Sequence, residues 1–254
     1  MKNNFFFKNK FANIYEKSSQ KSEVCSQILY GEKFKILSKN KKWLKIKTSF
    51  DNYTGYINDL NYVDKFNPKY KIFKLKSEIF KRLKNKRLSK TKSYLPFASK
   101  ISIIRENKKF IEFEKNKWIK RIDLKKVNHI EMDYLKIIKL FLNTKYVWGG
   151  KNHTGIDCSA ILQLFFYYNG IFYPRDTKDQ VKYLSESNDL YKYKKGDILF
   201  WKGHVAICEN SKKLIHAYGP KKKVLYMDII NTINRIKKTT NLKLIKKINI
   251  NKCI

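Results

Sequence analysis

Short runs that alternate apolar and polar residues dominate the first part of the chain. In KWLKIKT, Leu44 and Ile46 are interleaved with lysines, as in a strand with one face in water. Comparable runs separated by turn residues are FANIYEKSS, EVCSQILYGEKFKIL and YTGYINDLNYV. Gly31 and Gly55 are expected to mark turns. Residues 1–66 are therefore predicted to form a small all-β domain.

Residues 67–128 repeat this alternating pattern after an expected linker, FNPKYK, which contains Pro68. Strand-like runs such as KYKIFKLKSEIFKRL and FIEFEKNKWIKRIDL alternate with charged turns. We therefore expect a second small β-barrel, built as a copy of the first.

The pattern changes in residues 129–254. MDYLKIIKLFLNT and CSAILQLFFYYNG place apolar residues at helical spacing, and Gly170 is a suitable C-cap for the second helix. GDILFW, HVAICEN and KLIHAYG then follow as short strands with turns between them. Helices followed by strands predict an α+β domain.

One candidate for chemistry is the cysteine in YVWGGKNHTGIDCSA, residues 146–160. Asp157 is a good N-cap, which places Cys158 in the first turn of the following helix. Free amides and the positive end of the helix dipole favour a thiolate there. Taken alone, Cys158 is better understood as a small buried apolar residue.

Two histidines favour the chemical interpretation. His204 begins one predicted strand, His216 lies near the end of the next, and Asn210–Ser211 supplies a turn between them. A hairpin with that turn brings the two strands side by side. Thiol chemistry needs a base to take the thiol proton and a polar group to orient that base. Cys158, His204 and His216 are our candidate catalytic set.

The composition excludes several other classes of site. The 254 residues are 43% hydrophobic and 15% aromatic, which allows a core in two or three domains. The cysteines are widely spaced, form no CxxC pair and never combine with histidine at zinc-finger spacing. We expect no disulfide framework, no metal and no other cofactor.

The charge is extreme, with 57 Lys and Arg against 21 Asp and Glu for a net +36. Such a chain attracts polyanions at low salt whatever its function. The lysines are spread along the whole chain and accompany many Asn and Ile, which indicates a compositional bias. Without an arginine-rich arm or an RNA-binding signature, no specific nucleic-acid partner is expected.

No apolar run approaches the roughly 18–20 residues of a membrane span. The N-terminal MKNNFFFKNK has neither the apolar stretch of about 7–15 residues nor the cleavage site of a secretory signal. We expect a cytoplasmic protein without a transmembrane segment, unless an upstream segment is missing. The oligomeric state is left open.

Four motifs resemble, in order and spacing, those of the NlpC/P60 cysteine peptidases: YVWGGKNHTGIDCSA, PRDTKDQ, GDILFWKGHVAI and LIHAYG. The resemblance covers residues 133–227 and implies a papain-like catalytic domain. It assigns Cys158 as nucleophile, His204 as base and His216 as the residue that orients the base. Tyr146 would lie near the oxyanion site. Ala160 departs from the family, which usually has glycine there.

Residues 1–66 resemble bacterial SH3 (SH3b) domains in three stretches, LYGE, NKKWLKIK and YTGYI. Two such barrels before an NlpC/P60 domain resemble a subgroup that cleaves the γ-D-glutamyl–diamino acid bond of free murein peptides. That subgroup requires an unblocked N-terminal L-Ala and works as a dipeptidyl-peptidase. The lack of a signal sequence fits peptide recycling inside the cell.

The resemblance also implies acidic partners for the substrate ammonium. Asp157 and Ser159 beside the nucleophile are candidates, although Asp157 also suits helix capping alone. Glu32, with Tyr53 or Tyr56, could close the pocket from the first barrel. Arg175 could pair with a substrate carboxylate or with an acid of the protein itself. These six residues are the substrate-binding candidates.

Three other functions remain open. The chain could bind cell-wall fragments or polyanions without catalysis, or it could be an acyltransferase or amidase that uses the same thiol. A nucleic-acid-binding protein is the third. The sequence does not distinguish diaminopimelate from lysine, or free peptide from intact wall.

Overall fold

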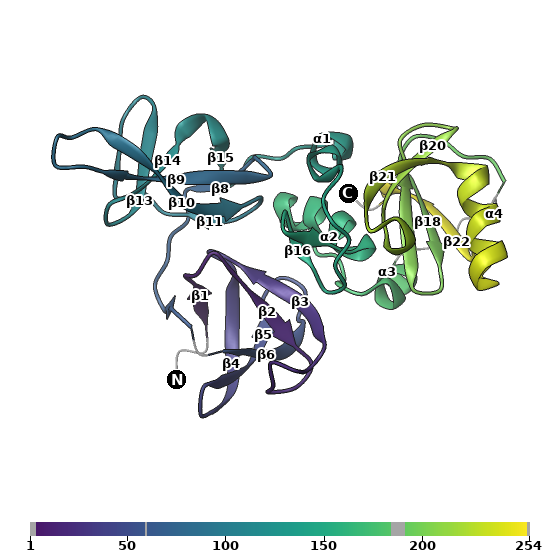
Figure 1. Cartoon of the computed structure of the whole chain (residues 1–254), viewed down its shortest axis with the longest axis horizontal. Coiled ribbons are helices and arrows are strands. Elements are labelled where there is room, and N and C mark those ends of the chain that lie inside the picture. The colour runs from purple at the N-terminus through teal and green to yellow at the C-terminus, as the bar shows by residue number, and fades with distance from the viewer. Residues whose placement is uncertain (1–3, 59, 184–190, 253–254) are drawn as a thin grey trace. The chain divides into compact units, whose positions relative to one another are not determined.

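A computed structural model describes residues 4–58, 60–183 and 191–252. The chain divides into two compact units, Met1–Ile130 and Glu131–Ile254. The first is built from strands, and the second combines helices with a sheet (Figure 1).

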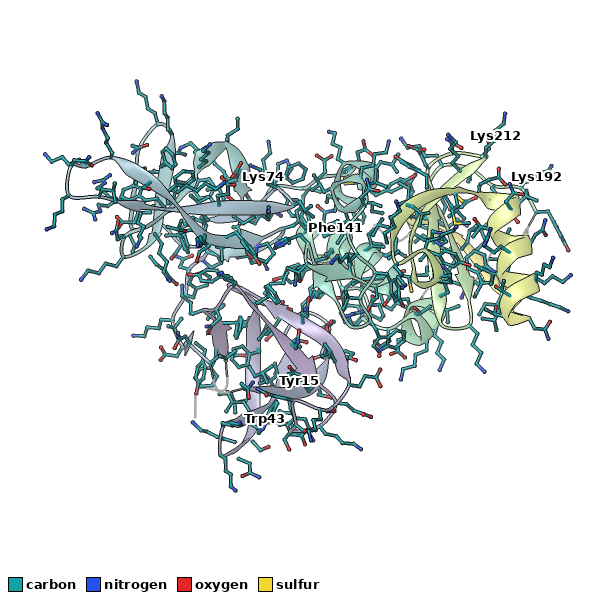
Figure 2. All side chains as sticks on the ribbon, in the orientation of Figure 1. Tyr15, Trp43, Lys74, Phe141, Lys192 and Lys212 are labelled. Atoms are coloured by element: carbon teal, nitrogen blue, oxygen red, sulfur yellow. The ribbon has the colours of Figure 1, made fainter. Side chains whose placement is uncertain are left out.

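The first barrel is a seven-stranded sheet with the order β3-β2-β6-β5-β4-β1-β7. The alternation in β5 is confirmed, because Leu44 and Ile46 are fully buried while the lysines between them are partly exposed. Tyr15 and Trp43 meet edge to face with ring centroids 5.5 Å apart (Figure 2). The strands are β1 (Phe5–Phe7), β2 (Phe11–Tyr15), β3 (Val24–Leu29), β4 (Lys33–Asn40), β5 (Trp43–Thr48), β6 (Thr54–Asn58) and β7 (Tyr62–Val63).

The turn predicted at Gly55 is wrong. Gly55 lies inside β6 and pairs with Ile46 of β5. A Cβ at this position would lie 2.4 Å from Ile14 and 2.8 Å from the carbonyl oxygen of Tyr15. The glycine is therefore explained by the close approach of β2 and not by a turn.

The second β part forms two sheets, ordered β10-β9-β14-β13-β12 and β11-β8-β15. Its core contains Ile79, Leu95, Ile111 and Phe113. The strands are β8 (Tyr70–Ile72), β9 (Lys76–Arg82), β10 (Leu88–Pro96), β11 (Lys100–Ile101), β12 (Arg105–Glu106), β13 (Phe110–Glu114), β14 (Lys117–Lys120) and β15 (Leu124–Lys126), with a 3-10 turn at Arg121–Asp123.

Tyr30 joins the two β parts of the first unit. It follows β3 of the first barrel, yet its ring belongs to the core of the second part and meets Phe113 at 5.6 Å. Its hydroxyl donates to Glu114 at 2.6 Å, and its carbonyl oxygen accepts from the backbone N–H of Lys100 at 3.0 Å. Gly31 has a φ of +76°, and a Cβ there would lie 2.3 Å from the Lys100 carbonyl oxygen. Only glycine allows this approach.

The second unit places a five-stranded antiparallel sheet, β21-β20-β19-β18-β22, beside α2 and α4 (Figure 1). All residues of α2 are buried, and the helix contacts β19 and β20. On α4, Ile229 and Ile236 join the core formed with Leu199 and Trp201. The helices are α1 (Tyr134–Ile138), α2 (Cys158–Asn169), α3 (Thr177–Tyr183) and α4 (Ile229–Thr240), and the strands are β16 (Lys151–Asn152), β17 (Gly155–Ile156), β18 (Asp197–Trp201), β19 (His204–Cys208), β20 (Lys213–Tyr218), β21 (Lys223–Asp228) and β22 (Lys246–Asn249).

The helix predicted in MDYLKIIKLFLNT is shorter than its apolar pattern. Asp133 caps α1, whose α-helical part ends at Ile138 and continues as a 3-10 turn over Lys139–Phe141. Leu142 then takes a ψ of 136°, which ends the helical segment, and Asn143 follows with a φ of +64°. The second predicted helix and its Gly170 C-cap are confirmed, with a φ of +71° at that glycine.

Candidate active site

Cys158 is the first residue of α2. The carboxylate of Asp157 caps this helix by accepting from the backbone N–H of Ala160 at 2.8 Å. The thiol is 3% exposed. Capping by Asp157 thus follows the prediction, and it fixes the direction in which α2 presents the thiol.

Asp157 is also the centre of a buried polar cluster. Both terminal nitrogens of Arg175 donate to the carboxylate of Asp157, at 3.0 Å and 2.6 Å. Gly149 N–H donates to it at 3.0 Å, and the Ser159 hydroxyl donates at 3.1 Å. Arg175, Asp157 and Ser159 are all at most 5% exposed. Arg175 was expected to pair either with a substrate carboxylate or with an acid of the protein. In the structure it pairs with Asp157.

The thiol of Cys158 lies beside the strand that carries His204. Its Sγ is 4.0 Å from the carbonyl oxygen of Gly203. Burial, and secondarily the charge of Asp157, raises the pKa of Cys158 to about 11, although the backbone N–H of Val205 and the side chain of Thr177 oppose this shift. The resting cysteine is therefore a neutral thiol at pH 7.

His204 and His216 form a hydrogen bond across a hairpin. In the hairpin β19–β20, Cys208 pairs with Leu214, so the expected side-by-side strands are present. His204 Nε2 lies 2.9 Å from His216 Nδ1. Burial lowers the pKa of His204 to about 4, and burial together with His204 lowers the pKa of His216 well below its usual value. Both imidazoles are neutral at pH 7.

Met227 determines the direction of this hydrogen bond. His216 Nε2 lies 3.2 Å from the Met227 thioether sulfur, which has no proton to donate. His216 therefore carries its proton on Nε2, and its Nδ1 accepts from Nε2–H of His204. The remaining nitrogen of His204, Nδ1, is left with a free lone pair, as a general base requires.

Aromatic rings enclose the two histidines. Tyr218 stacks on His216 with centroids 4.6 Å apart and an interplanar angle of 11°. Trp201 lies 5.6 Å from the ring of His204. This apolar packing removes water from both imidazoles, and it is the physical origin of their low pKa values.

Tyr146 belongs to the same region of the second unit. Its pKa is raised by burial, then by the charges of Cys158 and Asp157. Its ring passes within 3.5 Å of the position a Cβ would take at Gly219. The raised pKa keeps the phenol protonated, so it is able to donate a hydrogen bond.

The three candidates from the first barrel belong to the other unit and have partners there. Glu32 is 1% exposed and accepts from the backbone N–H of Leu29 at 3.0 Å. Tyr53 packs against the core of the first barrel, and the Lys45 ammonium lies over the ring of Tyr56. Their contribution to a substrate pocket stays a prediction.

Sequence reasoning missed Thr177 and Met227. Thr177 begins α3, for which no helix was predicted, and Met227 lies in β21, which was also not predicted. Thr177 lies within the PRDTKDQ motif, where no role was assigned to it, and no local signal marks Met227. Among the residues that the structure describes, no three His, Cys, Asp or Glu side chains are arranged to hold a metal ion. Nor does any helix within residues 4–58, 60–183 and 191–252 have the length and apolar character to cross a membrane.

Comparison with known proteins identifies two domains. Residues 143–241 match the NlpC/P60 family, and residues 10–62 match the bacterial SH3 domain. The chain thus carries a bacterial SH3 domain followed by an NlpC/P60 domain, which confirms the resemblance found in its motifs.

Two curated relatives are similar over part of the chain. Dipeptidyl-peptidase 6 of Lysinibacillus sphaericus is 34% identical over 77 residues, which are 30% of this chain and 28% of that protein. Gamma-D-glutamyl-L-lysine dipeptidyl-peptidase of Bacillus cereus is 31% identical over 93 residues, which are 34% of this chain and 28% of that protein. The matched segment therefore spans less than a third of either relative.

Solved structures share the fold. An NlpC/P60 family protein from Bacillus cereus has a TM-score of 0.79 at 16% identity and covers 96% of this chain and 98% of that one. An NlpC/P60 endopeptidase from Photobacterium damselae subsp. piscicida has a TM-score of 0.60 at 13% identity, with 96% and 70% covered. These likenesses confirm the predicted α+β fold class.

Proposed function

We propose that this protein is a cysteine peptidase that hydrolyses the γ-D-glutamyl–diamino acid bond of murein peptides with a free N-terminal L-Ala. The proposal rests on the place of Cys158 at the start of α2, beside the strand that carries His204. His204 in turn is hydrogen-bonded to His216. The names of the two curated relatives support the bond and the dipeptidyl mode of cleavage.

In the proposed reaction, Cys158 Sγ attacks the γ-D-glutamyl carbonyl carbon while the thiol proton moves to Nδ1 of His204. The backbone N–H of Cys158 and the hydroxyl of Tyr146 stabilise the oxyanion. His204 returns the proton to the departing amine as the C–N bond breaks and a thioester remains. His204 then takes a proton from the water that attacks the thioester. The C–S bond breaks, the dipeptide leaves, and His204 returns the proton to Cys158 Sγ.

Both reacting groups begin uncharged in this mechanism. A thiol with a pKa of about 11 and an imidazole with a pKa of about 4 do not exchange a proton at rest. Proton transfer therefore accompanies the attack. His216 positions His204 by accepting its Nε2–H hydrogen bond. Met227 positions His216 in the same way, through its thioether sulfur.

Recognition of the substrate ammonium is part of the proposal. A buried ammonium needs acidic or hydroxyl acceptors to offset its loss of water. Asp157 already accepts from Ala160, Gly149, Ser159 and Arg175, so its charge is shared with Arg175. Asp157 and Ser159 remain the proposed partners inside the second unit, and Glu32, Tyr53 and Tyr56 those from the first barrel.

Hydrolysis of L-Ala-γ-D-Glu-diaminopimelate, beside its N-acetylated form, tests this function. We expect the free-amine peptide to be cut into L-Ala-D-Glu and diaminopimelate, and the acetylated peptide to be cut at least about 100-fold more slowly, because about 3 kcal/mol of ammonium binding is lost. Cys158→Ala should remove turnover and keep the fold, as checked by circular dichroism.

The outcomes separate the parts of the proposal. Cleavage of both peptides would contradict the need for a free amine, and turnover by Cys158→Ala would contradict the nucleophile. If neither peptide is cut while Cys158 still reacts with an electrophile, the substrate class is wrong. The same assay with a lysine peptide and with intact murein tests the diamino acid and the proposed role in recycling free peptides in the cytoplasm.

A further inference from the structure

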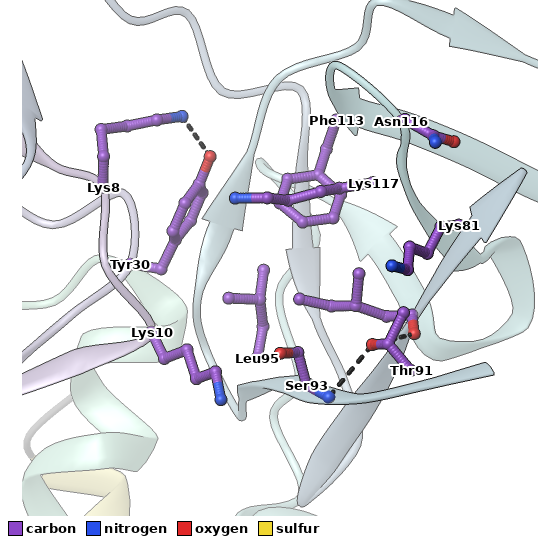
Figure 3. A pocket seen from close by; sticks show the side chains of 11 residues that line it. Lys8, Lys10, Tyr30, Lys81, Thr91, Ser93, Leu95, Phe113, Asn116 and Lys117 are labelled. Atoms are coloured by element: carbon purple, nitrogen blue, oxygen red, sulfur yellow. Dashed lines mark hydrogen bonds between the residues drawn. The ribbon is translucent and has the colours of Figure 1, made fainter.

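A cavity of about 310 Å³ lies within the Met1–Ile130 unit, where the two β parts meet (Figure 3). Lys8 and Lys10, between β1 and β2, and Tyr30 line one side of it. Residues of β9, β10, β13 and β14 line the other side. The contacts of Tyr30 with Phe113 and Glu114 hold the two sides together, so the cavity has a fixed frame.

Four ammonium groups surround this cavity. Lys8 and Lys10 come from the first barrel, and Lys81 of β9 and Lys117 of β14 come from the second part. Figure 3 shows their side chains around one space. Four positive charges brought together from separate segments repel one another, so an anion between them is strongly favoured.

Glu114 compensates only part of this charge. It forms ion pairs with Lys8 at 3.0 Å and Lys117 at 2.5 Å, and it accepts from Tyr30 at 2.6 Å. None of the described side chains that line the cavity is acidic. Four lysines and one carboxylate leave a local excess of three positive charges. Burial lowers the pKa of Lys8, and the charge of Lys117 lowers it further.

The walls indicate the rest of the ligand. Ile79, Leu95 and Phe113 form an apolar floor, while Thr91 and Ser93 add hydroxyl groups. Such a mixture suits a small polyol or sugar whose carbon skeleton packs on the floor and whose hydroxyls meet polar groups. The described lining contains lysine and no arginine. Lysine ammoniums bind phosphate as point charges, without the planar fork by which arginine binds both phosphate and carboxylate.

We propose that this cavity binds a phosphate ester of a small polyol or sugar, with the phosphate held among Lys8, Lys10, Lys81 and Lys117. The ligand is either a free phosphomonoester or one repeat of a polyol phosphodiester polymer, since both present the same chemistry. Binding here is separate from the thiol chemistry of the second unit.

The test is calorimetric titration of the full chain with glycerol 3-phosphate and, in parallel, with poly(glycerol phosphate). The test variant is Lys10→Gln/Lys81→Gln, which leaves the ion pairs of Lys8 and Lys117 intact. The control is Lys108→Gln/Lys109→Gln, at a second lysine-lined cavity of about 470 Å³ in the same unit. Both double variants remove two positive charges, so their long-range electrostatics are matched.

We expect saturable binding that weakens about ten-fold or more in the test variant and less than about two-fold in the control. Binding of the monoester points to a free metabolite, and binding of the polymer alone points to the diester; both support the site. Equal weakening in both variants, or no saturable binding of either probe, would overturn the proposal. A single-stranded oligonucleotide that displaces the probe and is weakened equally by the test variant would overturn it in favour of nucleic acid.

Discussion

At the scale of single residues, the environment of Cys158 and His204 controls their protonation. The pKa of the thiol is about 11 and that of the imidazole about 4, because both groups are buried. The positive end of α2 and two hydrogen-bond donors act in the opposite direction without overcoming burial. The pair is therefore neutral over the whole range between these values.

This leads to a prediction for alkylation by iodoacetamide. Only the thiolate reacts, so the rate at Cys158 should rise about ten-fold per pH unit from pH 7 to 10. Mass spectrometry of the Cys158 peptide gives the rate, and the Cys25 peptide serves as an internal reference. A plateau that begins below pH 7 would mean that a thiolate–imidazolium pair already exists at rest.

A second residue-scale prediction concerns Met227. Met227→Lys places a donor at His216 Nε2, which should move the proton of His216 to Nδ1 and that of His204 to its own Nδ1. The base is then blocked, and kcat should fall about 10–100-fold with little change in KM. Nitrogen-15 NMR shifts of the two imidazoles report the tautomers directly.

Met227→Leu is the matched control, because it removes the acceptor without supplying a donor. It should leave His204 protonated on Nε2 and lower kcat less than the lysine variant does. An unchanged His204 tautomer in Met227→Lys would contradict the role of the thioether, even if activity were lost.

The positions of the candidate catalytic residues follow from sequence signals, whereas those of their partners do not. Cys158 and the histidines lie at motif positions, where a cap and two strand ends are visible in the residue order. Met227 reaches His216 through the register of β20 and β21, and hydrophobic periodicity does not specify register between strands.

At the scale of elements, the start of α2 depends on one buried ion pair. Asp157 caps the helix, and Arg175 compensates its charge with side chains that are 7% and 1% exposed. Removing Arg175 leaves a buried carboxylate without its counter-ion. Arg175→Met should therefore lower the free energy of unfolding by about 3–5 kcal/mol, as measured by urea denaturation.

Lys139→Met provides the control for this prediction. It breaks the Lys139–Glu209 pair, whose side chains are 42% and 20% exposed, and should cost less than about 1 kcal/mol. The double variant Asp157→Asn/Arg175→Met should recover part of the loss, because a neutral amide costs less to bury. Equal losses in Arg175→Met and Lys139→Met would contradict a structural role for the buried pair.

Element boundaries were less predictable than element types. The helix from Cys158 to Asn169 carries both end signals, Asp157 and Gly170, and it ends where predicted. The preceding helix has the apolar spacing but becomes a 3-10 turn after Ile138 and ends at Leu142, whose backbone is extended. The turn predicted at Gly55 was wrong, because the sequence does not distinguish a glycine needed for close strand packing from a glycine in a turn.

At the scale of the whole molecule, lysines cover both units, as Lys74 and Lys212 illustrate (Figure 2). The two β parts of the first unit are joined at Tyr30 and Gly31, which the sequence did not predict. A tyrosine in a turn is usually a surface residue, and only the fold shows that its ring completes the core of the neighbouring part.

Gly31→Ala tests this joint. It combines a φ of +76° with a backbone collision at 2.3 Å, whereas Gly170→Ala has a φ of +71° and nothing within 4 Å. The first variant should be less stable than the second by about 1–3 kcal/mol. Hydrogen exchange should rise in both β parts, and a rise confined to the first barrel would contradict their coupling.

Tyr30 also has a consequence for how such a protein can change by recombination. An exchange that replaced residues 1–66 alone would remove a ring from the core of the neighbouring β part, together with the acceptor for the Lys100 N–H. A recombination that keeps both cores intact therefore has to exchange the two β parts together, with its break near residue 130, where the two compact units divide.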